Sequence, residues 1–122
     1  MATFMINRKL IQKNQAMNAI VSGEFESNIL SSKNRVVIIL TQDWCPQWTN
    51  MKSWIYGLEM DEDIEIYELE YNKVDYFYDF MRFKEKHWNN YNVPYLRFYK
   101  NGILTNETNY ISEKEFLDII GK

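Results

Sequence analysis

The sequence predicts an α/β domain with three layers, in which helices cover both faces of a central mixed sheet of four to five strands. Three observations predict it. Residues 35–41 form a continuous β-branched run, which is typical of a strand buried on both faces. Segments with helical spacing alternate with strand-like segments, and helical crossovers between strands imply a partly parallel sheet. A Lys-Asn-Gly turn between two apolar segments predicts a hairpin within residues 92–105.

Composition limits the classes of protein that the chain can represent. Its 122 residues, 46% of them hydrophobic and 16% aromatic, suit one domain with a substantial core. A net charge of −3 without a Lys/Arg stripe argues against nucleic-acid binding. The longest aliphatic run, residues 36–40, is far shorter than the roughly 20 residues of a membrane-spanning helix. A single cysteine cannot form an internal disulfide, so we expect a reducing, cytoplasmic location. Taken with the charge and the short aliphatic run, we expect neither nucleic-acid binding nor membrane contact.

The N-terminal third gives the weakest pattern. Residues 1–16 are expected to form an N-terminal arm or short helix, and residues 17–122 the domain proper. Residues 17–21 are compatible with a short strand or with the end of that helix. Residues 22–33 predict a short helix, since Phe25, Ile29 and Leu30 share a face and acidic residues occupy its first turn.

The middle of the chain is more regular. Residues 47–60 predict a helix with Trp48, Met51, Ile55 and Leu58 on one face, and Pro46 suits its first position. Residues 64–71 alternate in part between apolar and acidic side chains, which predicts a strand. We interpret the carboxylates of residues 61–70 as a charged turn and a solvated strand face, because they lack a recognised cation-binding pattern and we expect no metal.

Two helices are predicted in the remainder. Residues 74–88 form a long aromatic-rich segment with helical spacing, and Ser112 and Glu115 form a capping box that opens a final helix. Within the first of these, residues 76–83 carry aromatic side chains around most of the helix, more than a single buried stripe requires. We therefore expect a protein-binding surface there, or a homodimer contact.

Three landmarks, in this order and spacing, resemble the thioredoxin family over residues 17–121. The aliphatic strand is followed by Trp44-Cys45-Pro46-Gln47-Trp48, the pair Val93-Pro94 precedes the next-to-last strand, and Phe98-Tyr-Lys-Asn-Gly102 forms the hairpin. The resemblance implies a thioredoxin-like sandwich with an N-terminal extension. It also implies a redox-active centre for thiol-disulfide exchange, the activity of an oxidoreductase in cell redox homeostasis.

The resemblance implies roles for individual residues. Cys45 matches the nucleophile that attacks a disulfide, Pro94 the proline whose preceding peptide bond is cis, and Val93 the residue whose backbone pairs with an extended substrate. Physical reasoning supports the first role, because a thiol at a helix start faces free amide donors and the positive end of the helix dipole. Trp44 and Pro46 would flank the bound substrate.

Departures from the family pattern are equally informative. Trp48 stands in place of the second, resolving cysteine, so Cys45 cannot release a partner by forming an internal disulfide. Ile39 replaces the buried acid that assists proton transfer, and Glu68 lies where a lysine is usual. Tyr110 replaces a glycine that keeps the substrate groove open, and about seven extra residues precede Val93.

Two functions remain open. The first is a monothiol oxidoreductase, in which Cys45 forms a mixed disulfide with a protein or small thiol and an external thiol, such as glutathione, resolves it without a bound cofactor. Glutaredoxins also carry proline after their first cysteine. The second is a redox-silent protein-binding or chaperone-like adaptor, whose surface is lined by Trp44, Trp48 and Tyr110. Peroxide reduction has weak support, since Thr41 precedes Cys45 by four residues and peroxiredoxins place theirs three before.

Overall fold

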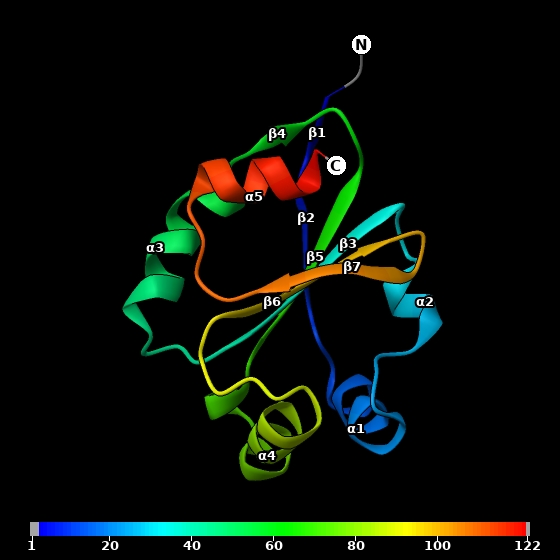
Figure 1. The fold of residues 1–122 in the computed structure, drawn as a ribbon, viewed down its shortest axis with the longest axis vertical. Coiled ribbons are helices and arrows are strands. Elements are labelled where there is room, and N and C mark those ends of the chain that lie inside the picture. The colour runs from blue at the N-terminus through cyan, green and yellow to red at the C-terminus, as the bar shows by residue number, and fades with distance from the viewer. Residues whose placement is uncertain (1–2, 122) are drawn as a thin grey trace.

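The computed structural model describes residues 3–121 as a five-stranded mixed sheet between two helical layers (Figure 1). The first three strands of the sheet run parallel to one another, and the last two run antiparallel to their neighbours. In spatial order the strands are β2 (Asn7–Leu10), β5 (Ile64–Glu70), β3 (Arg35–Thr41), β6 (Tyr95–Lys100) and β7 (Ile103–Thr108). A separate ribbon pairs β1 (Phe4–Met5) with β4 (Glu59–Met60).

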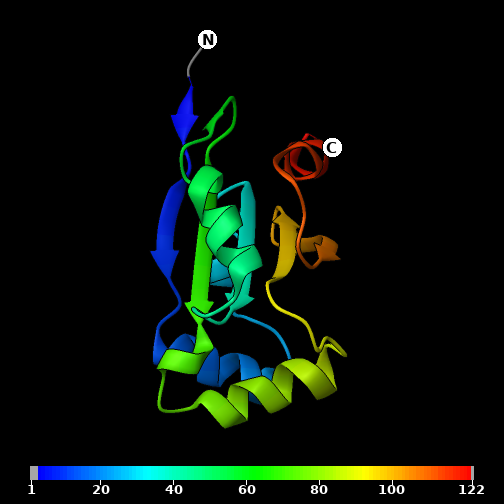
Figure 2. The ribbon, with the colours of Figure 1, turned by 90° about the vertical axis from the view of Figure 1, so that its left-hand side faces the viewer.

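The helices divide between the two faces of the sheet, as Figures 1 and 2 show. One face is covered by α3 (Pro46–Ile55) and α5 (Glu113–Ile120). The other is covered by α1 (Lys13–Ser22), α2 (Ser27–Leu30) and α4 (Phe77–His87), and η1 (Tyr71–Lys73) is a single 3₁₀ turn before α4. The three-layer architecture predicted from the sequence is confirmed.

The central strand β3 is buried along its whole length, as its β-branched run predicts. Val37 and Ile39 face α3 and α5, whereas Val36 and Ile38 face the opposite helical layer. The alternation follows from the two-residue period of a strand. Because both faces of β3 are covered, the strand has a fixed position at the centre of the sheet, and so does the start of the turn that follows it.

Turns and caps follow the expected chemistry. The hairpin between β6 and β7 turns at Asn101 and Gly102, both with positive φ (52° and 80°), which is the geometry of a type I′ turn. Pro46 is the first residue of α3. Ser112 caps α5 and accepts a hydrogen bond from the Glu115 amide, completing the predicted capping box.

The predicted helices are longer than the observed ones. The helix expected over residues 47–60 ends at Ile55, and the chain then enters β4. The helix expected over 74–88 spans Phe77–His87, and the one over 22–33 is the single turn of α2. Helical spacing extends past each end because apolar residues also continue into the adjoining loops, where they pack on the same core.

The N-terminal segment differs most from the prediction. Residues 7–10 are an edge strand of the central sheet rather than an arm or short helix, and residues 17–21 lie inside α1. Residues 1 and 2 lie outside the described residues. Strand β2 forms through parallel pairing with β5, about sixty residues away, with Arg8 opposite Ile66. A local sequence pattern does not contain this pairing, so the strand could not be predicted from it.

The acidic side chains of β5 are buried, so the prediction of a solvated strand face is wrong. Glu65 and Glu68 are only 1% and 2% exposed. Lys9 Nζ lies 2.8 Å from Glu65 Oε1, and Arg8 Nε lies 2.8 Å from Glu68 Oε1. Strand β2 covers this edge of β5 and supplies both cations, which is why acidic residues can occupy a buried strand.

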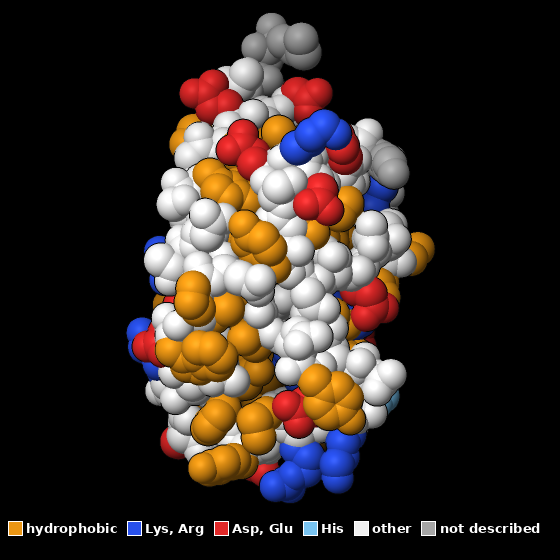
Figure 3. All heavy atoms as spheres, turned by 60° about the vertical axis from the view of Figure 1, so that its left-hand side comes forward, with side chains coloured by type: hydrophobic (Ala, Val, Ile, Leu, Met, Phe, Trp, Pro, Cys, Tyr) orange, Lys and Arg blue, Asp and Glu red, His pale blue; other side chains and the backbone are white. Residues whose placement is uncertain are grey.

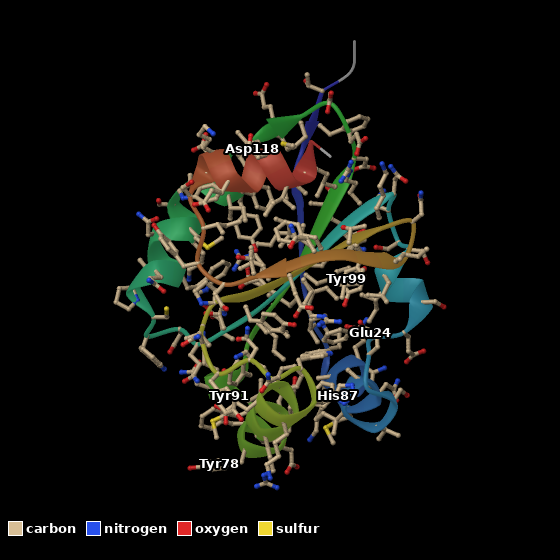
Figure 4. All side chains as sticks on the ribbon, in the orientation of Figure 1. Glu24, Tyr78, His87, Tyr91, Tyr99 and Asp118 are labelled. Carbon is tan, nitrogen blue, oxygen red and sulfur yellow. The ribbon has the colours of Figure 1, made fainter. Side chains whose placement is uncertain are left out.

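The aromatic residues of α4 are mostly covered by the chain itself. Phe80 is fully buried between Tyr71 and Phe83, with ring centroids 5.6 and 5.9 Å away. Tyr76 is also buried, whereas Tyr78 is exposed and points away from the body of the protein (Figure 4). The aromatic residues of α4 other than Tyr78 therefore pack on the chain's own core, and a partner or homodimer contact at residues 76–83 stays a prediction.

Candidate functional site

Cys45 lies at the N-terminal end of α3, in the turn that follows the central strand. It is the N-cap residue, and its carbonyl accepts the first intrahelical hydrogen bond, from the Thr49 amide at 3.0 Å. The Cys45 amide donates to the Gln42 carbonyl at 3.2 Å, which closes the turn. Because the first amides of a helix have no intrahelical acceptor, Cys45 stands at the positive end of the α3 dipole.

The second predicted element of the site lies directly beside the thiol. The Val93–Pro94 peptide bond is cis. Cys45 Sγ donates a hydrogen bond to the Val93 carbonyl over 3.6 Å. Strands β3 and β6 are antiparallel neighbours, so the end of β3 and the start of β6 lie at the same end of the sheet. The fold thus brings together two residues separated by 48 positions.

The thiol is enclosed in this structure. Cys45 is 3% exposed and belongs to the apolar cluster formed by α3, α5 and the sheet. Its hydrogen bond to Val93 requires a protonated sulfur, since a thiolate has no proton to donate. Ile39 is fully buried in the same cluster, so the position of the family's acid is apolar. Within residues 3–121, the hydrogen-bond partner of the sulfur is the Val93 carbonyl.

Trp48 lies beneath the site rather than in its surface. It is fully buried, and its Nε1 donates to Glu70 Oε2 at 2.9 Å. Lys52 Nζ donates to the same oxygen at 3.2 Å and lies 5.5 Å from the centre of the Trp48 ring. Partial burial alone would raise the pKa of Glu70, but the hydrogen bonds from Trp48 and Lys52 outweigh it and lower the pKa. Trp48 cannot line a binding surface, contrary to its predicted role.

Glu68 is also removed from the thiol. Its carboxylate accepts bonds from Arg8 Nε at 2.8 Å and from the Tyr56 hydroxyl at 2.6 Å. Burial and then the bond to Glu68 raise the pKa of Tyr56, so the phenol stays protonated and donates. Glu68 is therefore committed to the edge of the sheet that β2 covers and is not available as a proton carrier at Cys45.

Two aromatic residues form the exposed border of the site. Trp44 is 63% exposed and its Nε1 donates to Gln42 Oε1, whereas Tyr110 is 40% exposed and its hydroxyl donates to Asn50 Oδ1 at 2.9 Å. The Tyr110 bond joins the loop before α5 to α3. Pro46 is also exposed. Figure 3 shows that hydrophobic side chains gather on the lower part of the face that carries α3 and α4.

Lys84 is a residue of the site's framework that sequence reasoning missed. It is fully buried on α4, and its Nζ donates to the Asn90 carbonyl at 3.0 Å and to the Asn92 carbonyl at 2.7 Å. Burial lowers its pKa to about 8. Asn109 Nδ2 donates to the Pro94 carbonyl at 3.0 Å from the other side. These bonds hold the extra residues before Val93 in place. Sequence reasoning missed Lys84 because a lysine in an amphipathic helix gives no local signal of burial.

Two further features are absent from the part of the chain that the structure describes. Within residues 3–121, no group of three or more His, Cys, Asp or Glu side chains is arranged to hold a metal ion. None of the helices in that range is both long enough and apolar enough to cross a bilayer.

Comparison with known proteins assigns the fold. No family model matches the chain, and no curated protein matches it in sequence. Among solved structures, a mutant thioredoxin from Halobacterium salinarum superposes with a TM-score of 0.65 at 14% identity, covering 93% of this chain and 88% of that one. Thioredoxin O2 from Arabidopsis thaliana, in its oxidized state, gives 0.66 at 16% identity over 94% and 92%. Thioredoxin O1 from the same plant gives 0.64 at 15% over 97% and 96%.

These likenesses extend over nearly the whole chain, so the protein has the thioredoxin-like α/β fold. At such low identity they show the fold and not the activity. Function has to be argued from the turn at Cys45, the Val93–Pro94 edge and the residues that surround them.

Proposed function

We propose that the protein is a thioredoxin-like thiol-disulfide oxidoreductase of the monothiol type. The observation that carries the proposal is the placement of the Cys45 thiol at the start of α3 and 3.6 Å from the Val93 carbonyl, beside the cis Val93–Pro94 bond. A helix start presents backbone amide donors without intrahelical acceptors on the side of the sulfur. The backbone beside a cis-proline can pair with an extended disulfide-containing segment once the Cys45 bond to Val93 is released.

Each turnover needs the Cys45 thiol and one molecule of free glutathione, because the second glutathione of the oxidised product comes from the substrate. The Cys45 thiolate attacks the glutathione sulfur of a protein–glutathione mixed disulfide, forms a Cys45–glutathione disulfide and releases the protein thiolate. A glutathione thiolate then attacks the glutathione sulfur of that adduct, releases Cys45 and leaves oxidised glutathione. Two electrons pass from glutathione to the substrate, and Cys45 returns unchanged. A reducing compartment such as the cytoplasm, or another low-molecular-weight thiol, would sustain this cycle.

The enclosed thiol requires a local opening before attack. Cys45 is 3% exposed and its proton is held by the Val93 carbonyl. Release of that hydrogen bond would free both the sulfur and the backbone acceptor with which a substrate pairs. We propose that binding of an extended substrate at Val93 displaces the thiol and so couples recognition to exposure.

A redox-silent protein-binding or chaperone-like module is the second candidate, and the burial of Cys45 favours it. In this case the fully buried Trp48 stabilises the turn at Cys45, and the exposed Trp44 and Tyr110 contact the partner. One structural neighbour, thioredoxin f2, is known in complex with ferredoxin:thioredoxin reductase. Both proposals expect a protein partner at the end of the fold that carries Trp44 and Cys45.

The test is to incubate the folded protein with oxidised glutathione and to follow adducts by intact mass, with Cys45→Ser as the blank. The oxidoreductase proposal expects one glutathione adduct under native conditions and its removal by reduced glutathione. It also expects reduction of a glutathionylated peptide in a coupled assay with catalytic turnover. An adduct that forms only in urea would show a thiol permanently sealed by the fold, and the binding module alone would then stand.

A further inference from the structure

A groove lies between α1 and α4, on the face of the sheet opposite to α3 and Cys45. It is open to solvent and has a volume of about 310 Å³, which is at the lower end of the range of roughly 300–1,000 Å³ for small-molecule sites. Its floor is apolar and consists of Met17 and Ile20 from α1 and Phe83 from α4. The groove uses no residue of the thiol site, so it is a separate feature of the molecule.

The rim of the groove is positively charged. Arg82 and Lys86 line it, and they are one helical turn apart on the same face of α4. Both are exposed, and within the described residues neither forms an ion pair with a carboxylate. In a chain with a net charge of −3, two unpaired cations over an apolar floor are a local reversal of the overall charge.

The two ends of the groove differ in charge. Asp79 lines one end, one turn before Phe83, and Lys86 and His87 line the other. The His87 ring stacks on Phe83 with centroids 5.3 Å apart and lies against Gly23 at the end of α1, so it forms a flat wall (Figure 4). An anion would be repelled by Asp79 and attracted by Arg82 and Lys86, which gives the site a direction.

From this arrangement we infer that the groove binds a single-chain amphiphile with an anionic head and an apolar tail of about eight to ten carbon atoms. The tail lies on Met17, Ile20 and Phe83, and the head lies at Arg82 and Lys86. A medium-chain carboxylate has this chemistry. The limited volume favours such a small ligand over a partner helix, which needs a longer row of apolar contacts.

The test is a titration of the isotope-labelled protein with octanoate and decanoate, below the concentration at which either aggregates, followed by amide chemical shifts. We expect saturable shifts confined to residues of α1 and α4. Each added methylene should tighten binding about two- to fourfold while it is buried in the groove. Decanol, which lacks the charge, should bind at least about threefold more weakly than decanoate.

Charge reversal supplies the matched control. Lys86→Glu should weaken decanoate binding about three- to tenfold and should strengthen binding of decylammonium. Lys114→Glu makes the same change in net charge on α5, at the opposite end of the molecule (Figure 1), and should change neither by more than about twofold. Equal effects of the two variants, equal binding of decanol, or shifts centred on Trp44 and Tyr110 would each overturn the inference, as would self-association that covers the groove.

Discussion

Trp48 Nε1 donates a 2.9 Å hydrogen bond to Glu70 Oε2 directly beneath the turn that carries Cys45. The indole thus joins α3 to the end of β5. Because Glu70 also accepts from Lys52 and Lys73, its charge is balanced although the side chain is only 15% exposed. The only polar atom of the Trp48 side chain is therefore satisfied by a carboxylate whose charge is itself balanced.

Trp48→Phe keeps an aromatic ring in the core and removes the donor to Glu70. Since a hydrogen bond to a charged group contributes about 1.5–3 kcal/mol, the free energy of unfolding should fall by about 2 kcal/mol. Urea denaturation measures it. Trp44→Phe is the matched control, because Trp44 is exposed and its loss should change stability by less than about 0.5 kcal/mol. Equal effects of the two variants would show that the Glu70 bond contributes nothing.

Trp48→Cys places two thiols at the spacing of the family's dithiol motif. Under mild oxidation we expect an internal disulfide between Cys45 and the introduced thiol, seen as a loss of two hydrogens in the intact mass and of both free thiols. The reduced variant should be destabilised by about 3–5 kcal/mol, because a cavity replaces a fully buried indole. Folded protein in which both thiols persist after oxidation would contradict the assignment of this turn as a thioredoxin-type site.

Tyr110→Gly should make the thiol more reactive. The Tyr110 hydroxyl bonds Asn50 and so joins the loop before α5 to the helix that carries Cys45. Its removal should allow that loop and α3 to separate more readily, and we expect the native thiol to react with a disulfide reagent about tenfold faster. Tyr110→Phe keeps the ring and removes only the bond, so it should give a smaller increase. An unchanged rate in both variants would show that the Tyr110 bond to Asn50 does not restrict access to the sulfur.

Arg8→Ala should destabilise the protein, although Arg8 lies on an exposed edge strand. It removes the cation that pairs with Glu68, which is 2% exposed. Half of the Arg8 side chain is in solvent, so we expect a loss of about 1–3 kcal/mol rather than the roughly 3–5 kcal/mol of a fully buried pair. Guanidinium titration measures it. Lys114→Ala, which breaks an exposed pair on α5, should lower stability by no more than about 0.5 kcal/mol.

The sequence predicts the elements that depend on neighbouring residues, and it misses the contacts between residues that are far apart in the chain. The strand at residues 35–41, the hairpin turn at Asn101 and the Ser112 cap each depend on side chains within a few positions, and all three were found. Strand β2 requires Arg8 to meet Glu68 across about sixty residues. The hydrogen bond of Cys45 likewise requires Val93, which is distant in sequence. A hydrophobic pattern does not contain the distance between a thiol and a carbonyl on another loop.

Lys84→Met tests whether the loop before Val93 is held by a buried cation. Three acceptors, the Asn90 and Asn92 carbonyls and Asn90 Oδ1, lose their donor, so we expect faster hydrogen exchange in residues 89–93. Because Val93 accepts from Cys45, the thiol should also react faster. Lys86→Met, two residues away and exposed, should change neither rate.

The same variant tests the direction of the Lys84 pKa shift. Burial lowers the folded-state pKa to about 8 from an ordinary value of 10.5, so the folded state binds fewer protons than the unfolded chain between these values. The stability of the parent protein relative to Lys84→Met should therefore rise as pH increases from about 8 to 10.5, by about 2 kcal/mol. Urea midpoints of both proteins across that range measure the difference. A constant difference would show that Lys84 titrates normally, and its ammonium group would then have access to water.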